Sequence, residues 1–140
     1  MKKILFPLIS VLLLASTVFA AEGNVVIIAN KSVPVSSIAG ATLKLIYLGK
    51  KNTWPDGSAV VPVALQSGST HEAFLGQFIE KSSSQYSSFW KQAIFTGEGT
   101  PPRSFADFSD LASYVANTPG AIGYVSAGTS VENVKILRIE

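Results

Sequence analysis

The residues of this sequence best suited to bind a ligand form one short segment, residues 66–70. An apolar run, residues 59–65, precedes it, and an apolar stripe at helical spacing follows at residues 74–79. A strand, a short loop of Gly, Ser and Thr, and then a helix commonly hold an anion. The first amides of a helix have no intrahelical partner, and the helix dipole adds partial positive charge there. The candidate ligand-binding residues are therefore Gln66, Ser67, Gly68, Ser69 and Thr70.

The same segment has a purely structural interpretation. Ser69-Thr70-His71-Glu72 fits a capping box, in which Ser69 and Glu72 satisfy the orphan amides of the helix start. The two interpretations are compatible, because a capped helix end can leave other amides free. Both therefore stay open at the level of the sequence.

The sequence offers little for catalysis. His71 is the only histidine, and it lies too close to Ser69 in the chain for the usual triad geometry, in which base and nucleophile come from separate segments. Ser67-Gly68-Ser69 is not a Gly-x-Ser-x-Gly elbow. The chain has no cysteine, so thiolate metal sites and thiol catalysis are excluded. We expect no enzyme activity, no catalytic residue, no metal site and no cofactor.

The first 20 residues have the pattern of a signal peptide. Met1-Lys2-Lys3 is a basic start, an apolar run follows to Ala15, and Val18-Phe19-Ala20 offers small residues for cleavage. We expect the cut after Ala20, leaving one domain over residues 21–140. No cysteine is available for lipid attachment. The expected location is the periplasm or the exterior, with no membrane insertion once the signal is removed.

The charge of the chain changes when that segment is removed. Lys2 and Lys3 account for two of the 11 Lys and Arg residues, so nine remain against 9 Asp and Glu residues. The basic pI of the precursor therefore says nothing about a nucleic-acid partner, and no basic run suggests one. A chain of this length without disulfides must depend on one ordinary hydrophobic core.

Hydrophobic patterning predicts an α/β layered domain. The expected strands cover residues 24–30, 59–65, 121–125 and 134–139. Helices are expected from Ser36 or Ser37 to Leu48, from Ser69, after the Ser82-Ser83-Ser84 cap, and from a capping box at Ser104–Asp107 to about Asn117.

The sequence also leads to a structural expectation for each of four single residues. Trp54 should pack as a turn anchor, although it could instead be a ligand platform. Pro62 removes one ladder donor, so its strand should lie at an edge or be distorted there. Gly123 suggests a close approach by a neighbour. Arg103 could reach an anion, although an exposed surface arginine is the default.

Several segments, taken in order, resemble one family. They are residues 45–50 (Leu-Ile-Tyr-Leu-Gly-Lys), 54–58 (Trp-Pro-Asp-Gly-Ser), 67–69 (Ser-Gly-Ser) and 118–125 (Thr-Pro-Gly-Ala-Ile-Gly-Tyr-Val). The chain resembles the phosphate-binding periplasmic proteins of phosphate ABC transporters, within the type II periplasmic binding protein superfamily. The resemblance implies one lobe of that fold, a single layered α/β domain with a mixed β-sheet flanked by helices.

Two departures from the family pattern bear on function. Family members are about twice as long and close two lobes around the anion, whereas only the second lobe has a counterpart here. Their phosphate loop also carries an arginine, and Leu65 occupies that position. Ser69 and Thr70 still match the serine and threonine of the loop. The resemblance therefore implies weak binding of phosphate or another oxyanion. The alternative is an accessory or protein-interaction module without the ligand, with a partner in the envelope or a second copy of the chain.

Overall fold

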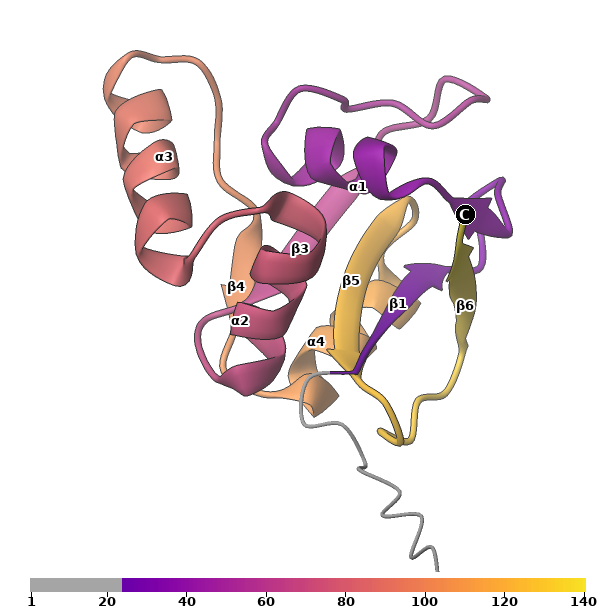
Figure 1. Ribbon diagram of the computed structural model, residues 1–140. Helices are drawn as coiled ribbons and strands as arrows, with labels where there is room; N and C mark the ends of the chain where they lie inside the picture. Colours follow the sequence, from indigo (N-terminus) through magenta and orange to yellow (C-terminus); the bar gives the residue numbers. More distant parts are fainter. Residues whose placement is uncertain (1–23) are drawn as a thin grey trace, which may run out of the picture.

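A six-stranded mixed sheet runs through the middle of the molecule in the order β2-β6-β1-β5-β3-β4 (Figure 1). The computed structural model describes residues 24–140, so the predicted signal peptide lies outside the described residues. The elements are β1 (Val25–Asn30), β2 (Ser37–Ile38), α1 (Gly40–Tyr47), β3 (Val61–Leu65), α2 (Ser69–Phe74), the π-helical turn η1 (Leu75–Ile79), α3 (Ser83–Phe95), β4 (Arg103–Phe105), α4 (Phe108–Asn117), β5 (Ala121–Ser126) and β6 (Val134–Ile139).

Helices cover both faces of the sheet, as expected for an α/β layered domain (Figure 1). On one face α4 approaches β5 closely: a Cβ at Gly123 would lie 2.8 Å from Leu111 Cδ2 and 3.2 Å from Val115 Cγ2. On the other face the ring of Tyr124 stacks on Phe74 of α2, with centroids 3.8 Å apart. The glycine is therefore required by the packing of α4, which confirms the expectation for Gly123.

The sheet is mixed because one half contains antiparallel strand pairs and the other half contains parallel pairs. β1 pairs antiparallel with β5 and β6, while β3 pairs parallel with β5 and β4. The carboxyl ends of β3, β4 and β5 therefore lie at one edge of the sheet. In open α/β sheets this edge is where ligands bind.

Pro62 lies in β3, which is an inner strand and not an outer one. The Val61 amide donates to Gly120 O on the β5 side, at 3.1 Å, so the nitrogen of Pro62 faces the β4 side. Pairing with β4 begins only at Val63. The missing donor therefore falls where the strand has no neighbour, and the proline leaves no ladder bond broken.

The first helix starts later than expected, and its buried face is not the stripe of Ile38, Ala41, Leu45 and Leu48 that helical spacing predicts. Ser37 and Ile38 form β2, which pairs with the end of β6, and α1 begins at Gly40. Leu43, Ile46 and Tyr47 are its buried residues, whereas the exposed fraction of Leu45 is 43%. The run is apolar on almost every side, so periodicity alone did not fix the inner face. Gly49 ends the helix at φ +73°, as expected.

The capping box predicted at Ser104–Asp107 is replaced by a strand and a later cap. Arg103 to Phe105 form β4, which extends the sheet beyond β3. The helix cap is Asp107, whose carboxylate Oδ1 accepts the Asp110 amide at 2.8 Å, and α4 begins at Phe108. The predicted Ser104–Asp107 box is wrong, because pairing with β3 holds Ser104 in extended backbone.

Trp54 fastens the connection between α1 and β3 to the start of β5. Its ring is 3% exposed, and its Nε1 donates to Gly120 O at 3.0 Å. The Gly120 amide donates to Ser32 Oγ at 3.0 Å, which ties in the end of β1 as well. The prediction of a turn anchor for Trp54 is confirmed. Together with the bond from Val61, the backbone of Gly120 is hydrogen-bonded to three segments of the chain.

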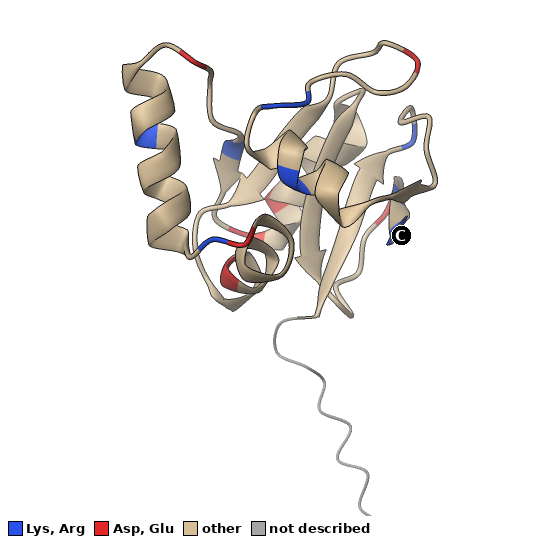
Figure 2. Ribbon diagram, turned by 45° about the horizontal axis from the view of Figure 1, so that its top comes forward, with Lys and Arg blue, Asp and Glu red and all other residues tan. Residues whose placement is uncertain are grey.

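α3 stands beside the β4 edge of the sheet rather than on either face (Figure 1). A capping box at Ser82 and Gln85 starts it, as the serine run predicted. It packs inward through Tyr86, Trp90 and Ala93. Lys91 is its only charged residue, so Figure 2 shows a basic band on this helix and no acidic one.

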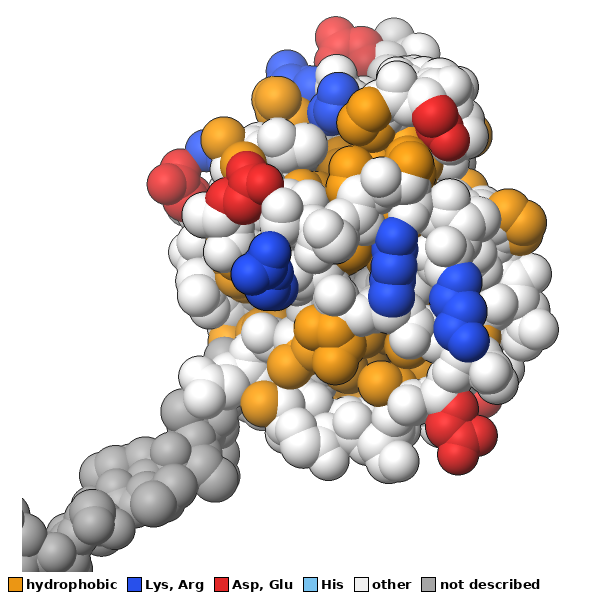
Figure 3. All heavy atoms as spheres, turned by 90° about the vertical axis from the view of Figure 1, so that its right-hand side faces the viewer, with side chains coloured by type: hydrophobic (Ala, Val, Ile, Leu, Met, Phe, Trp, Pro, Cys, Tyr) orange, Lys and Arg blue, Asp and Glu red, His pale blue; other side chains and the backbone are white. Residues whose placement is uncertain are grey.

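The apolar side chains of β6 differ in how deeply they are buried. Leu137 is the buried residue, while the exposed fractions of Ile136 and Ile139 are 58% and 41%. Figure 3 faces this side and shows apolar and basic side chains interleaved. Lys135 and Arg138 alternate with the isoleucines in sequence. β2 pairs with β6 at Arg138 and Ile139, and charged side chains beside the remaining open edge of β6 discourage pairing with another chain.

Candidate functional site

Residues 67–70 of the predicted segment line a hollow where two helices begin, whereas Gln66 lines a different cavity. The hollow has a volume of about 280 Å³, and Leu65 and the segment Ala106–Phe108 complete its lining. α2 starts at Ser69 and α4 at Phe108, and both starts lie at the carboxyl edge of the parallel strands (Figure 1). The Gln66 amide donates to Phe105 O at 2.9 Å, which holds the two connections together. Segments 40 residues apart in the chain thus form one site.

Gly68, and not Ser69, is the cap residue of α2. Its φ of +101° and ψ of 172° suit a residue without Cβ, and no side chain caps this helix end. The predicted capping box at Ser69–Glu72 is therefore wrong, since Ser69 already lies in the first helical turn. The Ser69 hydroxyl is consequently not used to satisfy the helix start.

The start of α2 offers several donors toward this hollow. The first intrahelical bond runs from the Glu72 amide to Gly68 O at 3.0 Å. Within residues 24–140, the amides of Ser69, Thr70 and His71 have no protein acceptor. An oxyanion at this edge would meet these amides and the positive end of the helix dipole.

Thr70 is the most informative side chain of the segment, because it is only 7% exposed. Its hydroxyl has no hydrogen-bond partner in the described part of the chain, yet it is not among the fully enclosed unpartnered atoms there. The hydroxyl therefore reaches solvent through the hollow that Thr70 lines. A nearly buried polar group is normally paired, so this one is available to a ligand.

The electrostatics of the hollow are less favourable to an anion. Of the described residues, its lining includes Asp107 and neither lysine nor arginine. The guanidinium of Arg103 lies elsewhere, over the rings of Tyr114 and Phe105 at 5.1 and 5.5 Å. It lines a separate surface with Asp110 and Asn117. The idea that Arg103 reaches the anion is not supported by this geometry.

Asp107 is the site residue that sequence reasoning missed in this role. It was assigned to the last position of a capping box, whereas it is itself the N-cap of α4. Its second carboxylate oxygen remains free of a protein donor among residues 24–140. The sequence held a usable indication, an aspartate before an apolar helical stripe, but not the fact that this cap faces Ser69 and Thr70.

His71 lies just behind the site in a buried chain of hydrogen bonds. The Leu65 amide donates to Tyr124 Oη at 3.0 Å, and that hydroxyl is 2.5 Å from His71 Nδ1. Among the described residues, Nδ1 is the one acceptor available to the proton of that hydroxyl, so the hydroxyl donates to Nδ1 and the remaining imidazole proton lies on Nε2. Burial lowers the pKa of His71 from its ordinary 6.5, and raises the pKa of Tyr124 well above 10.

This histidine gives a test of the network through the pH dependence of stability. Its folded-state pKa is lowered, so the unfolded chain binds a proton more readily below pH 6.5. The free energy of unfolding should be constant above that pH and fall below it, by at most about 1.4 kcal/mol per pH unit. Urea unfolding between pH 5 and 7.5 measures this. Because His71 is the only histidine, His71→Gln should remove the slope, and an unchanged slope would contradict the account.

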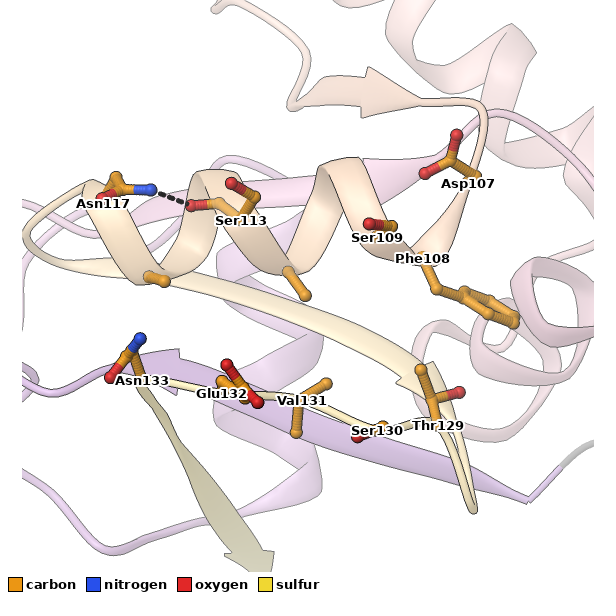
Figure 4. A pocket seen from close by; sticks show the side chains of 12 residues that line it. Asp107, Phe108, Ser109, Ser113, Asn117, Thr129, Ser130, Val131, Glu132 and Asn133 are labelled. Atoms are coloured by element: carbon orange, nitrogen blue, oxygen red, sulfur yellow. Dashed lines mark hydrogen bonds between the residues drawn. The ribbon is translucent and has the colours of Figure 1, made fainter.

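A larger hollow beside α4 is not a better candidate. It has a volume of about 790 Å³ and lies between α4 and residues 129–133 (Figure 4). Its polar side chains are exposed or half-buried, and the Asn117 amide donates to Ser113 O of its own helix. Asp107 and Glu132 line it. An open, acidic groove of this kind does not suit an oxyanion.

In residues 24–140, no three metal-ligating side chains converge. In the same range, no helix is both long and apolar enough to cross a membrane.

Comparison with known proteins gives a consistent result. The model of the PBP superfamily domain matches residues 16–136. No curated protein matches the sequence.

Several solved structures share the fold. One, assigned as a phosphate ABC transporter substrate-binding protein and solved with bound phosphate, comes from Clostridium perfringens. It is 20% identical with a TM-score of 0.64, over 82% of this chain and 44% of that one. An ABC-type phosphate transport receptor from Vibrio cholerae is 18% identical with a TM-score of 0.65, over 82% and 45%. PstS from Borrelia burgdorferi is 15% identical with a TM-score of 0.61, over 83% and 47%. The chain spans less than half the length of these proteins.

Proposed function

This chain belongs to the PBP superfamily, and from that premise we propose that it is an exported solute-binding module that binds phosphate or a similar oxyanion weakly at residues 66–70. One observation carries the proposal. The nearly buried Thr70 hydroxyl, without a protein partner within residues 24–140, opens into a hollow beside the free amides that start α2. The ligand-binding residues we propose remain Gln66, Ser67, Gly68, Ser69 and Thr70.

The affinity should be low for a physical reason. Phosphate is strongly hydrated, so tight binding requires many donors in a closed, dry site. Here the donors are neutral hydroxyls and amides, and the described lining of the hollow contains no cation. The aligned part of this chain covers less than half of each structure with the same fold, 44% and 45% of the first two. We expect millimolar binding.

Asp107 should decide which oxyanion is preferred. Hydrogen phosphate keeps a proton that it can donate to a carboxylate, whereas sulfate at neutral pH has none and is repelled. Asp107→Asn should raise the affinity for sulfate about tenfold, since the repulsion between two like unit charges ~4 Å apart is worth ~1 to 4 kcal/mol. Asparagine is an equally good helix cap, so α4 should remain intact. An unchanged ratio of phosphate to sulfate affinity would show that Asp107 does not face the ligand.

Calorimetric titration of residues 21–140 tests the proposal. Phosphate should give saturable heat, sulfate much less, and sodium chloride at matched ionic strength only dilution heat. Absence of saturable heat with phosphate, at concentrations well above millimolar, would leave residues 66–70 as an ordinary helix start. The relatives would then be a guide to the fold alone.

A second candidate is a protein-interaction module that keeps the lobe without its ligand. The observation that favours it is the tip of α3, where Phe95 is 93% exposed and Ile94 is 54% exposed. The first partner to test for this candidate function is a second copy of the chain. Sedimentation should then show a dimer that Phe95→Ser dissociates, and a monomer at every concentration would count against it.

Export is the remaining part of the proposal. The predicted signal peptide would direct the chain to the periplasm or the exterior, with cleavage near Ala20. N-terminal sequencing of the exported protein should begin at Ala21. Detection of the protein only with Met1 at its start would overturn this part.

A further inference from the structure

A second cavity lies beneath α3; it shares Leu65 with the first hollow, and Gln66 lines this cavity and not the first. It has a volume of about 350 Å³, within the range of small-molecule sites. Its walls come from the ends of β3 and β4, from α2, and from the inner side of α3 together with the prolines that precede β4. The apolar part of the lining includes Tyr86, Trp90, Ile94 and Pro101.

His71 forms the deepest polar point of this cavity. The residue is 6% exposed, and its Nδ1 is occupied by the Tyr124 hydroxyl. Its Nε2 has no protein partner within residues 24–140, and among those residues the one fully enclosed unpartnered side-chain atom is Trp90 Nε1. Nε2 is therefore not sealed off. Since His71 lines the cavity, this N–H is directed into it as a donor.

The charge of the lining favours an anion. Lys91 lines the cavity, whereas no aspartate or glutamate does among the residues described. Within the described chain the salt bridge present joins Lys44 and Glu80, so Lys91 has no acidic partner there. Ser104 adds a hydroxyl from the opposite wall. This differs from the first hollow, where Asp107 is present and lysine is absent.

We propose that this cavity binds a small carboxylate that carries one apolar ring. The carboxylate accepts from His71 Nε2–H and pairs with the Lys91 ammonium, both of which are donors without acceptors of their own. The ring packs against Trp90, Tyr86 and Pro101. The combination of one deep donor, one cation and flat apolar walls recognises an amphipathic anion and does not recognise inorganic phosphate, which has no apolar part.

Tryptophan fluorescence makes the proposal testable. The chain has two tryptophans: Trp90 lines the cavity, and Trp54 is held at Gly120. Titration with cyclohexanecarboxylate, which does not absorb at the excitation wavelength, should change the fluorescence saturably. Cyclohexylmethanol, the matched neutral probe, should bind at least about tenfold more weakly. Phosphate should not displace the carboxylate, which separates this site from the one at residues 66–70.

Two variants complete the test. Lys91→Met should weaken cyclohexanecarboxylate binding about five- to tenfold, as expected for one charge-assisted hydrogen bond at an exposed side chain. Lys31→Met removes the same charge from the exposed end of β1 and should have no effect. Equal binding of the alcohol, equal loss in the two variants, or no saturation would each overturn the proposal.

Discussion

Gly120→Ala should lower the free energy of unfolding by about 3 to 5 kcal/mol. A Cβ at this position would lie 2.1 Å from the carbonyl oxygen of Ala59, which is backbone and cannot rotate away. The residue also has a φ of +79°, a left-handed conformation that costs an alanine about 1 to 2 kcal/mol. Any shift that relieves the contact must also disturb the bonds of Trp54, Ser32 and Val61 to Gly120.

Gly128→Ala is the matched control for that substitution. Gly128 has nearly the same φ, +84°, but a Cβ there meets no atom within 4 Å. It should therefore cost only the conformational part, about 1 to 2 kcal/mol. Urea unfolding of the two variants separates the cost of the steric contact from the cost of the positive φ. Equal losses would mean that the three segments are not joined tightly at Gly120.

Replacing Ser69 by Ala and Thr70 by Val should abolish detectable phosphate binding. Valine keeps the shape of Thr70 in its nearly buried position, so the change removes hydroxyls and leaves the amides in place. A hydrogen bond to a charged group contributes about 1.5 to 3 kcal/mol, so two lost donors lower a millimolar affinity at least about a hundredfold. Calorimetry measures the loss.

The control for this double variant makes the same chemical change in the groove between α4 and residues 129–133. Ser113→Ala with Thr129→Val also removes one serine and one threonine hydroxyl, from a surface that the proposal does not use. This variant should bind phosphate as the unaltered chain does. If both double variants lost binding equally, the effect would be on folding. If neither did, the hydroxyls would have no part in the site.

The sequence predicted those elements whose pattern is local. Residues 121–125 follow Pro-Gly and are small and apolar, and residues 66–70 separate an apolar run from a helical stripe. Both were found where expected, as β5 and as the start of α2. The edge strand β4 was missed, because three largely exposed residues form it only by pairing with β3.

The candidate site could likewise be predicted only where its pattern is local. Ser69 and Thr70 could be named from their own neighbourhood, because a loop before a helix is a local pattern. Asp107 could not be placed beside them, since the contact depends on how β3 and β4 align in the sheet. The pairing of His71 with Tyr124 likewise joins residues 53 positions apart. Chemistry shared between distant segments requires the fold.

The central claim is that phosphate binds at the start of α2. The most direct measurement is a phosphate titration of the ¹⁵N-labelled chain, residues 21–140, followed by the backbone amide resonances, because this detects millimolar binding residue by residue. The account predicts saturable shifts at Ser69, Thr70 and His71, with smaller ones at Phe108 across the hollow. Shifts that are absent, that do not saturate, or that cluster away from residues 66–70 would contradict it.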